Sequence, residues 1–179
     1  MKIYKKISFV IAIMFVVNMA AFQHSKSILK KVAKETKKAF DVADFQMENI
    51  TITDEVNGLL SNRITTNQLN KLKSDTVTIG YVYIAQALSK TDKFDYLILL
   101  DFNLIIKKVK VLMYREDYGG EIGSKRWLKQ FIGKSTADHL KYKKDIMAIS
   151  GATISARSMT IAVNNFLKNI TILKENKIL

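Results

Sequence analysis

Cysteine and proline are both missing from this sequence of 179 residues. Without cysteine, the protein has no disulfide bond, no cysteine-bound metal and no catalytic thiol. Without proline, no proline-rich linker divides the chain, and its length suits one ordinary domain behind an N-terminal segment. Only two histidines are present, His24 and His139, so we expect neither a histidine-rich metal site nor a Ser-His-Asp triad.

Acidic residues are also few, since 16 Asp and Glu face 29 Lys and Arg and give a formal net charge of +13. Such a balance suggests an anionic partner, such as lipid headgroups, phosphate or nucleic acid, although we favour the simpler explanation of a solvated lysine surface. The basic residues are spread along the chain and are not interleaved with aromatic residues, so we expect no nucleic-acid partner.

The N-terminal 24 residues have the pattern of a signal for export. Lys2, Lys5 and Lys6 precede an apolar run over residues 7–17 that only Ser8 interrupts. The cleavage motif is poor, so residues 1–24 are expected to be either a signal peptide or an uncleaved signal anchor, with one domain over residues 25–179. Lysines lie on both sides of the run, and charge alone therefore does not fix its orientation.

Apolar residues recur at helical spacing from Ile28 to Phe40, and lysines fill the other positions. This pattern predicts an amphipathic helix. The helix either lies along anionic lipid or packs on its own domain with a solvated lysine face, and we favour the second arrangement.

The middle of the chain predicts an α+β fold, a small antiparallel sheet with flanking helices. Runs rich in β-branched, aromatic and leucine residues predict strands over residues 76–85, 95–101 and 104–113, joined as a meander. A shorter strand is expected over residues 49–53. Short helices are expected over residues 54–60, capped by Asp54, and over 66–72, beginning at Thr66.

Glycine is scarce, yet four of the seven glycines fall within fifteen residues, from Gly119 to Gly133. This stretch is expected to be rich in turns and able to line a ligand, because glycine allows close backbone approach. Within it, Ser124 is expected to cap a helix with Trp127 and Phe131 in the core, and Gly133 to end that helix.

The sequence from Ser150 to Ser155 places small and hydroxyl residues at the start of a long amphipathic segment. Free N–H groups and the positive end of the helix dipole make such a terminus a natural phosphate site, to which Arg157 could add a cation. The alternative is that Thr153 or Ser155 merely caps the helix.

Three segments together resemble the FMN-binding domain family, which includes the G subunit of the Rnf complex and the C subunit of sodium-translocating NADH:quinone reductase. They are Glu116-Asp-Tyr-Gly-Gly-Glu-Ile122, Trp127-Leu-Lys-Gln-Phe-Ile-Gly-Lys134 and Ser150-Gly-Ala-Thr-Ile-Ser155. Small exported members of the family are the most similar. The resemblance runs from about Thr76 to Phe166 and implies FMN as the cofactor.

In that family a flavin transferase joins FMN by a phosphoester to the threonine that closes the Ser-Gly-Ala-Thr motif. The resemblance therefore implies covalent FMN on Thr153. The other residues that it places at the cofactor are Ser150, Gly151, Ala152, Ser155, Glu116, Tyr118, Gly119, Gly120 and Glu121. One position departs from the family pattern, because Met147 stands where an acidic residue usually precedes the motif. Asp145 could partly compensate if residues 145–147 are extended, which leaves covalent attachment open.

These residues lead to a first hypothesis, an electron carrier on the periplasmic side of the inner membrane, held there by its N-terminal segment or secreted. It would exchange electrons with a membrane redox partner, and no catalytic residue of its own is expected. The alternatives are a module that binds FMN without a covalent bond and a flavin-dependent reductase of a small acceptor that uses Glu116 or Glu121. A basic protein that binds membrane or nucleic acid has only the net charge in its favour.

Overall fold

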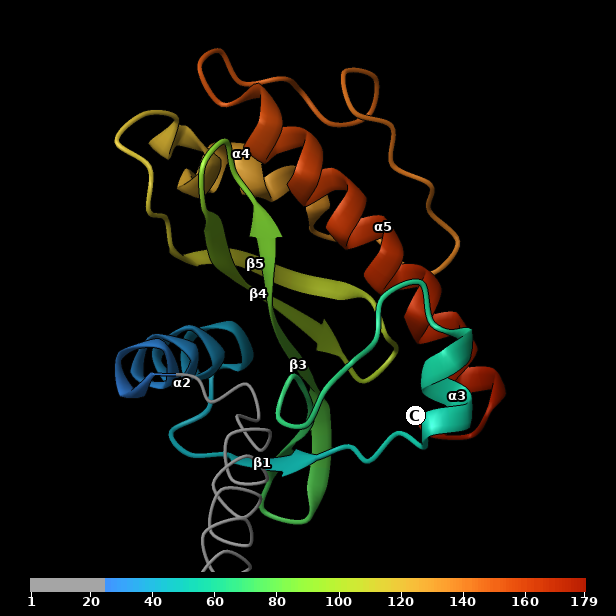
Figure 1. Cartoon of the computed structure of the whole chain (residues 1–179). Helices are drawn as coiled ribbons and strands as arrows, with labels where there is room; N and C mark the ends of the chain where they lie inside the picture. Colours follow the sequence, from blue (N-terminus) through green and yellow to red (C-terminus); the bar gives the residue numbers. More distant parts are fainter. Residues whose placement is uncertain (1–24) are drawn as a thin grey trace, which may run out of the picture.

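A computed structural model describes residues 25–179, in which five antiparallel strands form one sheet in the order β1-β2-β3-β4-β5 (Figure 1). The strands are β1 (Gln46–Asn49), β2 (Leu69–Ser74), β3 (Val77–Leu88), β4 (Lys93–Asp101) and β5 (Ile106–Met113). Every neighbouring pair is antiparallel, as expected of strands joined by short connections. The predicted α+β class and the meander of three long strands are therefore confirmed.

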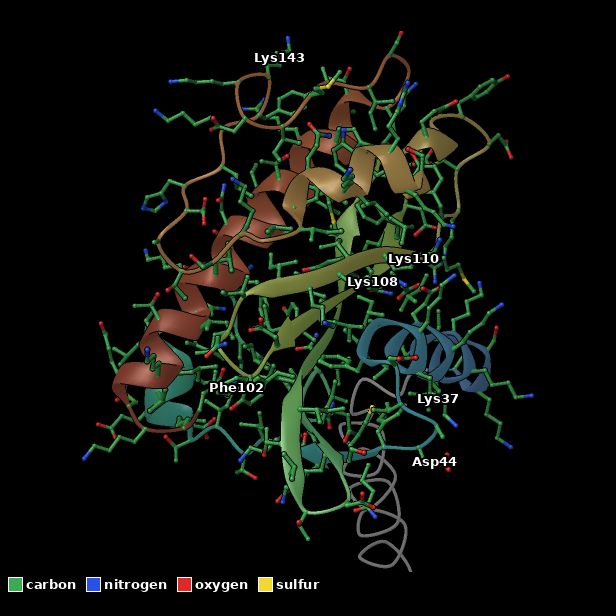
Figure 2. The ribbon with its side chains drawn as sticks, turned by 180° about the vertical axis from the view of Figure 1, so that it is seen from behind. Lys37, Asp44, Phe102, Lys108, Lys110 and Lys143 are labelled. Atoms are coloured by element: carbon green, nitrogen blue, oxygen red, sulfur yellow. The ribbon has the colours of Figure 1, made fainter. Side chains whose placement is uncertain are left out.

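Helix α2 (Lys26–Phe40) covers one face of this sheet. Ser25 caps its first turn by accepting a hydrogen bond from Ile28 N at 3.3 Å, and Asp41 ends it in a left-handed conformation. Ile28 and Val32 are buried against Leu97 and other residues of β2 to β5, so the helix packs on its own domain as predicted. Figure 2 shows the helix beside Lys108 and Lys110 of β5.

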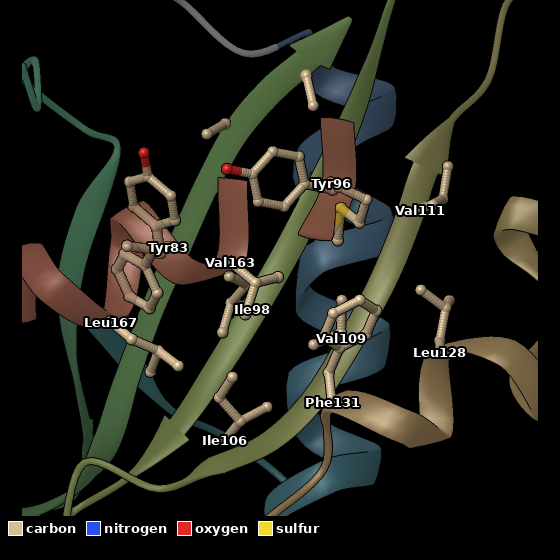
Figure 3. Close-up of a cluster of buried hydrophobic side chains, with 14 of the residues drawn as sticks. Tyr83, Tyr96, Ile98, Ile106, Val109, Val111, Leu128, Phe131, Val163 and Leu167 are labelled. Carbon is tan, nitrogen blue, oxygen red and sulfur yellow. The ribbon is translucent and has the colours of Figure 1, made fainter. Parts of the chain in front are cut away.

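Helix α5 (Thr153–Glu175) covers the opposite face and helps to form the larger core (Figures 1 and 3). Alternate residues of β4 divide between the two faces, because successive strand side chains point to opposite sides of a sheet. Ile98 joins the core under α5, whereas Leu97 joins the core under α2. Tyr83 of β3 stacks on Phe166 of α5 with ring centroids 4.3 Å apart, which fixes α5 along the sheet.

Three shorter helices complete the described structure: α3 (Asp54–Leu59), α4 (Lys125–Leu128) and the 3₁₀ helix η2 (Lys129–Phe131), with a further 3₁₀ turn η1 (Gly120–Gly123) before α4. Ser124 caps α4 by accepting a hydrogen bond from Trp127 N. Trp127 and Phe131 are buried, and Gly133 follows in a left-handed conformation. All three of these predictions are confirmed.

The predicted helix over residues 66–72 is wrong, because Leu69 to Ser74 form strand β2. Leu69 and Leu72 are three residues apart, which suits a helix, but each is buried in a different core on either side of the sheet. The predicted strand over 49–53 is also wrong beyond Asn49, where β1 ends. Ile50 N donates a last hydrogen bond to the Leu69 carbonyl oxygen, and Ile50 and Ile52 pack against the larger core. Thr53, rather than Asp54, caps α3.

The predicted signal peptide or anchor, residues 1–24, lies outside the described residues. Within residues 25–179, no helix has both the length and the apolar character that a membrane span requires. The boundary after residue 24 stays a prediction.

Candidate functional site

The Ser-Gly-Ala-Thr segment forms the turn into α5, and Thr153 is the first residue of that helix. Gly151 takes a left-handed conformation with φ of 77°, and Ala152 is buried at the position that usually carries a capping side chain. Alanine has no oxygen to accept from the first turn, and no side chain caps α5. The alternative that Thr153 or Ser155 caps this helix is therefore wrong. Thr153 is exposed beside N–H groups at the positive end of a helix of 23 residues.

Gly119 brings the acidic and glycine-rich segment against this turn. Its φ is 81°, and a Cβ at this position would lie 2.8 Å from the Ala152 Cβ and 3.1 Å from the Gly151 carbonyl oxygen. Any larger residue would push the two segments apart, so the absence of a side chain is what lets them meet. The structure thus joins two segments that lie some thirty residues apart in the sequence.

Ser155 has a positioning contact of its own. Its Oγ lies 3.0 Å from the hydroxyl oxygen of Tyr114, just after β5, and its side chain is buried. This hydrogen bond ties the first turn of α5 to the end of the sheet. Ser155 therefore fixes the first turn of α5 through a buried hydrogen bond, while Thr153 remains exposed.

Glu116 is held by the turn between β3 and β4. Its Oε1 accepts hydrogen bonds from Thr91 N at 2.7 Å and Asp92 N at 3.3 Å. The backbone N–H of Thr91 favours the ionised carboxylate and is the main cause that lowers the pKa of Glu116 to about 2. Glu116 is therefore a fixed anion at neutral pH, and its role is to hold the β3–β4 turn against the site.

An open pocket of about 570 Å³ lies between these elements. Its lining residues are Lys90, Thr91, Tyr114, Glu116, Asp117, Tyr118 and the segment from Gly151 to Ser155. Sequence reasoning missed Lys90 and Thr91, because only the fold brings the β3–β4 turn to α5. Lys90, rather than Arg157, is the basic residue in this lining.

The predicted site residues do not all share this pocket. Glu121 and Ser150 line a neighbouring hollow of about 710 Å³ with Trp127, Gln130 and Met147. Gly120 is exposed, has open space where a side chain would be, and lines neither hollow. The turn at residues 150–151 therefore separates two hollows, and Thr153 belongs to the one that contains Glu116 and Tyr118.

The backbone at Met147, just before the turn at residues 150–151, is held by hydrogen bonds with side chains of α4 and η2. Trp127 Nε1 donates a hydrogen bond of 2.7 Å to the carbonyl oxygen of Met147, and Gln130 Oε1 accepts one of 2.8 Å from Met147 N. These two side chains bind the backbone of Met147 and leave its thioether 70% exposed. Gln130 was not among the predicted residues, although its uncharged polar side chain lies between the buried residues Trp127 and Phe131 of the same segment.

Asp145 does not take the place of the missing carboxylate. Residues 143–145 form a turn rather than the extended segment that compensation would need. The Asp145 Oδ2 accepts a hydrogen bond of 2.7 Å from Lys141 N and so closes this turn. The carboxylate at position 145 serves local structure, and position 147 has none.

The arrangement fits a flavin nucleotide. An exposed hydroxyl stands at an uncapped helix N-terminus, which suits a phosphate, and the pocket beside it has the size of ordinary cofactor sites. Tyr118, which is 83% exposed at this pocket, offers an aromatic surface for a planar ring. These features suit an α+β protein that binds a nucleotide cofactor.

A family model described as the FMN-binding domain matches residues 33–168 of this chain. The chain therefore belongs to the FMN-binding domain family, and FMN is its cofactor. The match spans the sheet, α4 and the first two-thirds of α5, so it includes both segments that meet at Gly119. Comparison with the curated proteins found no match.

Proposed function

We propose that the protein is an extracytoplasmic electron carrier whose FMN is joined to Thr153 by a phosphoester bond. The observation that carries the proposal is the exposed Thr153 at the uncapped start of α5, beside the 570 Å³ pocket. Thr153 Oγ1 would attack the flavin-side phosphorus of a flavin dinucleotide, and the bond from that phosphorus to the bridging oxygen would break. The nucleoside monophosphate would leave with the hydroxyl proton, a flavin transferase would be the catalyst, and the protein would gain one FMN less one water. The small residues Gly151 and Ala152 leave room for a bulky nucleotide to reach this hydroxyl.

The bound flavin would accept and release electrons, and the protein would supply its position and surroundings. Thr153 fixes the phosphate end, while Lys90 offers a positive charge and Tyr118 an aromatic face. Gly119 packs closely against Ala152, and Tyr114 forms a hydrogen bond with Ser155. These two contacts fix the segment from Tyr114 to Gly119 against the start of α5.

The placement of the acidic residues favours a carrier over a reductase with its own substrate. Glu116 is bound to backbone N–H groups and remains ionised at neutral pH, so it is a poor proton donor there. Glu121 lines the neighbouring hollow. The two carboxylates that a reductase could have used therefore do not converge on one pocket.

Membrane association is part of the same proposal. The basic head and the apolar run over residues 7–17 are typical of an export signal or signal anchor. A carrier held at the outer side of the inner membrane would exchange electrons with a membrane redox partner.

A second candidate function is FMN binding without a covalent bond. It is favoured by Met147, whose exposed thioether cannot bind a metal or accept a hydrogen bond as a carboxylate does. It is also favoured by Asp145, which is engaged within its own turn. Noncovalent binding would use the same pocket and leave Thr153 unmodified.

The test is flavin fluorescence of the protein band in a denaturing gel, with the intact mass, after export and co-expression with a matching flavin transferase. The wild type is expected to fluoresce and to gain the mass of one FMN less one water, and Thr153→Ala to do neither. Ser150→Ala removes a hydroxyl from the same turn and should keep the flavin.

An unmodified wild type would reject the covalent bond. Fluorescence that appears only in Met147→Asp would identify residue 147 as the cause. FMN that the folded wild type retains and the denatured protein releases would favour the second function.

A further inference from the structure

The outer face of α2 is a surface of one charge. At about 100° per residue, its six lysines fall within an arc of about 140°, opposite the buried arc of Ile28, Val32 and Thr36. The lysines of this arc are Lys26, Lys30, Lys31, Lys34, Lys37 and Lys38. Ser27 is the one other residue in it, and the helix's single acidic residue, Glu35, lies outside. We call this set of six lysines the α2 lysine face.

Strand β5 extends the same basic surface. Lys110 lines a groove of about 330 Å³ together with Lys31 and Lys34 of α2. Lys108 lies beside it, and Figure 2 shows both strand lysines facing the helix. Glu35 also lines this groove, so the helix and the edge strand present a basic surface that contains one acidic residue.

Few acidic groups neutralise this surface. Lys108 pairs with Glu35 at 2.5 Å, and Lys37 pairs with Asp44 at 2.8 Å. Across residues 25–179, Lys26, Lys30, Lys34 and Lys38 have no ion pair. The uncompensated charges form a row that crosses the α2 lysine face obliquely, because residues four apart are displaced by about 40° around a helix.

This row weakens the helix that carries it. Lysines four residues apart lie on neighbouring turns and repel each other, and residues 26, 30, 34 and 38 make three such pairs in succession. The first turn has no acidic residue, and Lys26 stands there against the positive end of the helix dipole. A surface chosen only for solubility would mix the two signs, so an anionic partner explains this pattern better.

The sequence before α2 indicates which anionic partner this is. The apolar run ends at Val17, and only residues 18–24 separate it from the cap residue Ser25. Seven residues span at most about 25 Å, so an apolar run within a bilayer would hold α2 close to the headgroups. Surfaces that bind single-stranded nucleic acid usually add aromatic side chains for base stacking, and the α2 lysine face has none.

We propose that the α2 lysine face binds the anionic headgroups of a phospholipid bilayer. The proposal rests on the membrane association proposed above and is independent of how FMN is attached. Because α5 and its pocket lie on the opposite side of the sheet, this docking leaves Thr153 uncovered. The orientation would keep the cofactor open to a redox partner.

The test uses the absence of native cysteine, which makes an introduced thiol unique. Ser27→Cys, labelled with a fluorophore, reports on the α2 lysine face without removing a lysine. The full chain is reconstituted in vesicles of phosphatidylcholine with or without phosphatidylglycerol, and quenching by aqueous acrylamide is measured. Lys168→Cys, exposed on α5, is the matched control position.

We expect the label at position 27 to be protected from acrylamide only in the anionic vesicles, and the label at position 168 to stay accessible in both. Salt should reverse the protection, since raising it from about 0.1 M to about 1 M shortens the Debye length from about 10 Å to about 3 Å. Lys26→Gln, Lys30→Gln and Lys34→Gln combined should weaken docking about a hundredfold, at about fivefold for each lysine.

A matched triple variant removes the same charge elsewhere. It combines Lys141→Gln, Lys143→Gln and Lys144→Gln, at and just before the turn that Asp145 closes. It should dock as the wild type does. Equal loss in both triple variants, equal protection in neutral vesicles, or an accessible label in anionic vesicles would overturn the proposal. Protection by a short DNA duplex but not by anionic vesicles would overturn the choice of lipid.

Flavin absorbance of the same samples separates the two proposals. Docking without bound FMN would contradict the carrier function alone. Bound FMN without docking would contradict the lipid surface alone.

Discussion

The short helical segment that contains Trp127 and the start of α5 at Thr153 are two parts of the same family motif, but their side chains differ in exposure. Trp127 and Phe131 are buried, and their rings meet edge to face at 5.3 Å. Ser150, Gly151 and Thr153 are exposed. The first segment supplies packing and holds the backbone of Met147, three residues before the turn, by hydrogen bonds from Trp127 and to Gln130. The second segment presents the exposed hydroxyl of Thr153. A family motif thus contains both a support and a site, and substitutions should separate the two.

The largest loss of stability is expected from Trp127→Ala. It removes a buried indole together with the hydrogen bond to the Met147 carbonyl, and should lower the free energy of unfolding by about 3–5 kcal/mol. Urea unfolding measures the change. Ile132→Ala in the same segment removes a half-exposed side chain and should cost less than about 1 kcal/mol. Equal losses in the two variants would show that Trp127 is not the support described above.

The contact between the segment at Gly119 and the start of α5 at Ala152 is tested by comparing substitutions at two glycines. Gly119 and Gly133 both have φ of 81°, but only Gly119 has a neighbour where a Cβ would be. Gly133→Ala should cost about 1–2 kcal/mol from backbone strain alone. Gly119→Ala should cost about 1–3 kcal/mol more, because its Cβ would overlap that of Ala152.

Gly119→Ala should also retain less FMN than Gly133→Ala, measured by absorbance after purification. Similar unfolding energies and similar flavin content would mean that the approach of Gly119 to Ala152 does not shape the site.

A smaller effect, dependent on pH, is expected from Glu116→Gln. The pKa of Glu116 falls from its ordinary 4.5 to about 2 in the folded protein, chiefly through the Thr91 N–H. A lowered pKa stabilises the fold above the unfolded value and loses that contribution as pH falls. The wild type should therefore melt above the variant at neutral pH, and the gap should close between pH 4.5 and pH 2. A gap that persists at pH 2 would contradict the ionic role of this carboxylate.

The smallest effect on stability is expected from Thr153→Ala. The side chain is exposed at the first helical position and makes no capping bond, so unfolding should change by less than about 0.5 kcal/mol. The same urea titration checks this value. A loss as large as that of Trp127→Ala would remove the distinction between support and site.

Sequence patterns predicted the parts of the fold that depend on local order. The strands β3, β4 and β5 have β-branched, aromatic or leucine residues at half or more of their positions, and the helix after Ser124 has its cap and its apolar pair in place. Strand β2 was missed because its two buried leucines serve opposite faces. Spacing cannot show that, since a strand between two layers needs no alternation.

The sequence named many of the residues at the candidate site, but it did not show how they are arranged in space. The motif placed Thr153 at the start of a helix, as the structure has it, and Gly119 was named for its freedom of approach. The division of the set between two hollows, the binding of Glu116 to Thr91 and the part of Lys90 all arise from contacts across the fold. Such contacts join segments more than twenty residues apart, and one sequence carries no signal of them.

Covalent attachment of FMN to Thr153, as proposed above, is best tested by peptide mapping of the exported, transferase-matured protein. Trypsin should release residues 145–157 as one peptide, because Lys144 and Arg157 flank it. This peptide contains three hydroxyl residues, Ser150, Thr153 and Ser155, and tandem mass spectrometry distinguishes them. We predict that the mass of one FMN less one water is found on Thr153. The same mass on Ser150 or Ser155, or a peptide without flavin, would contradict the account.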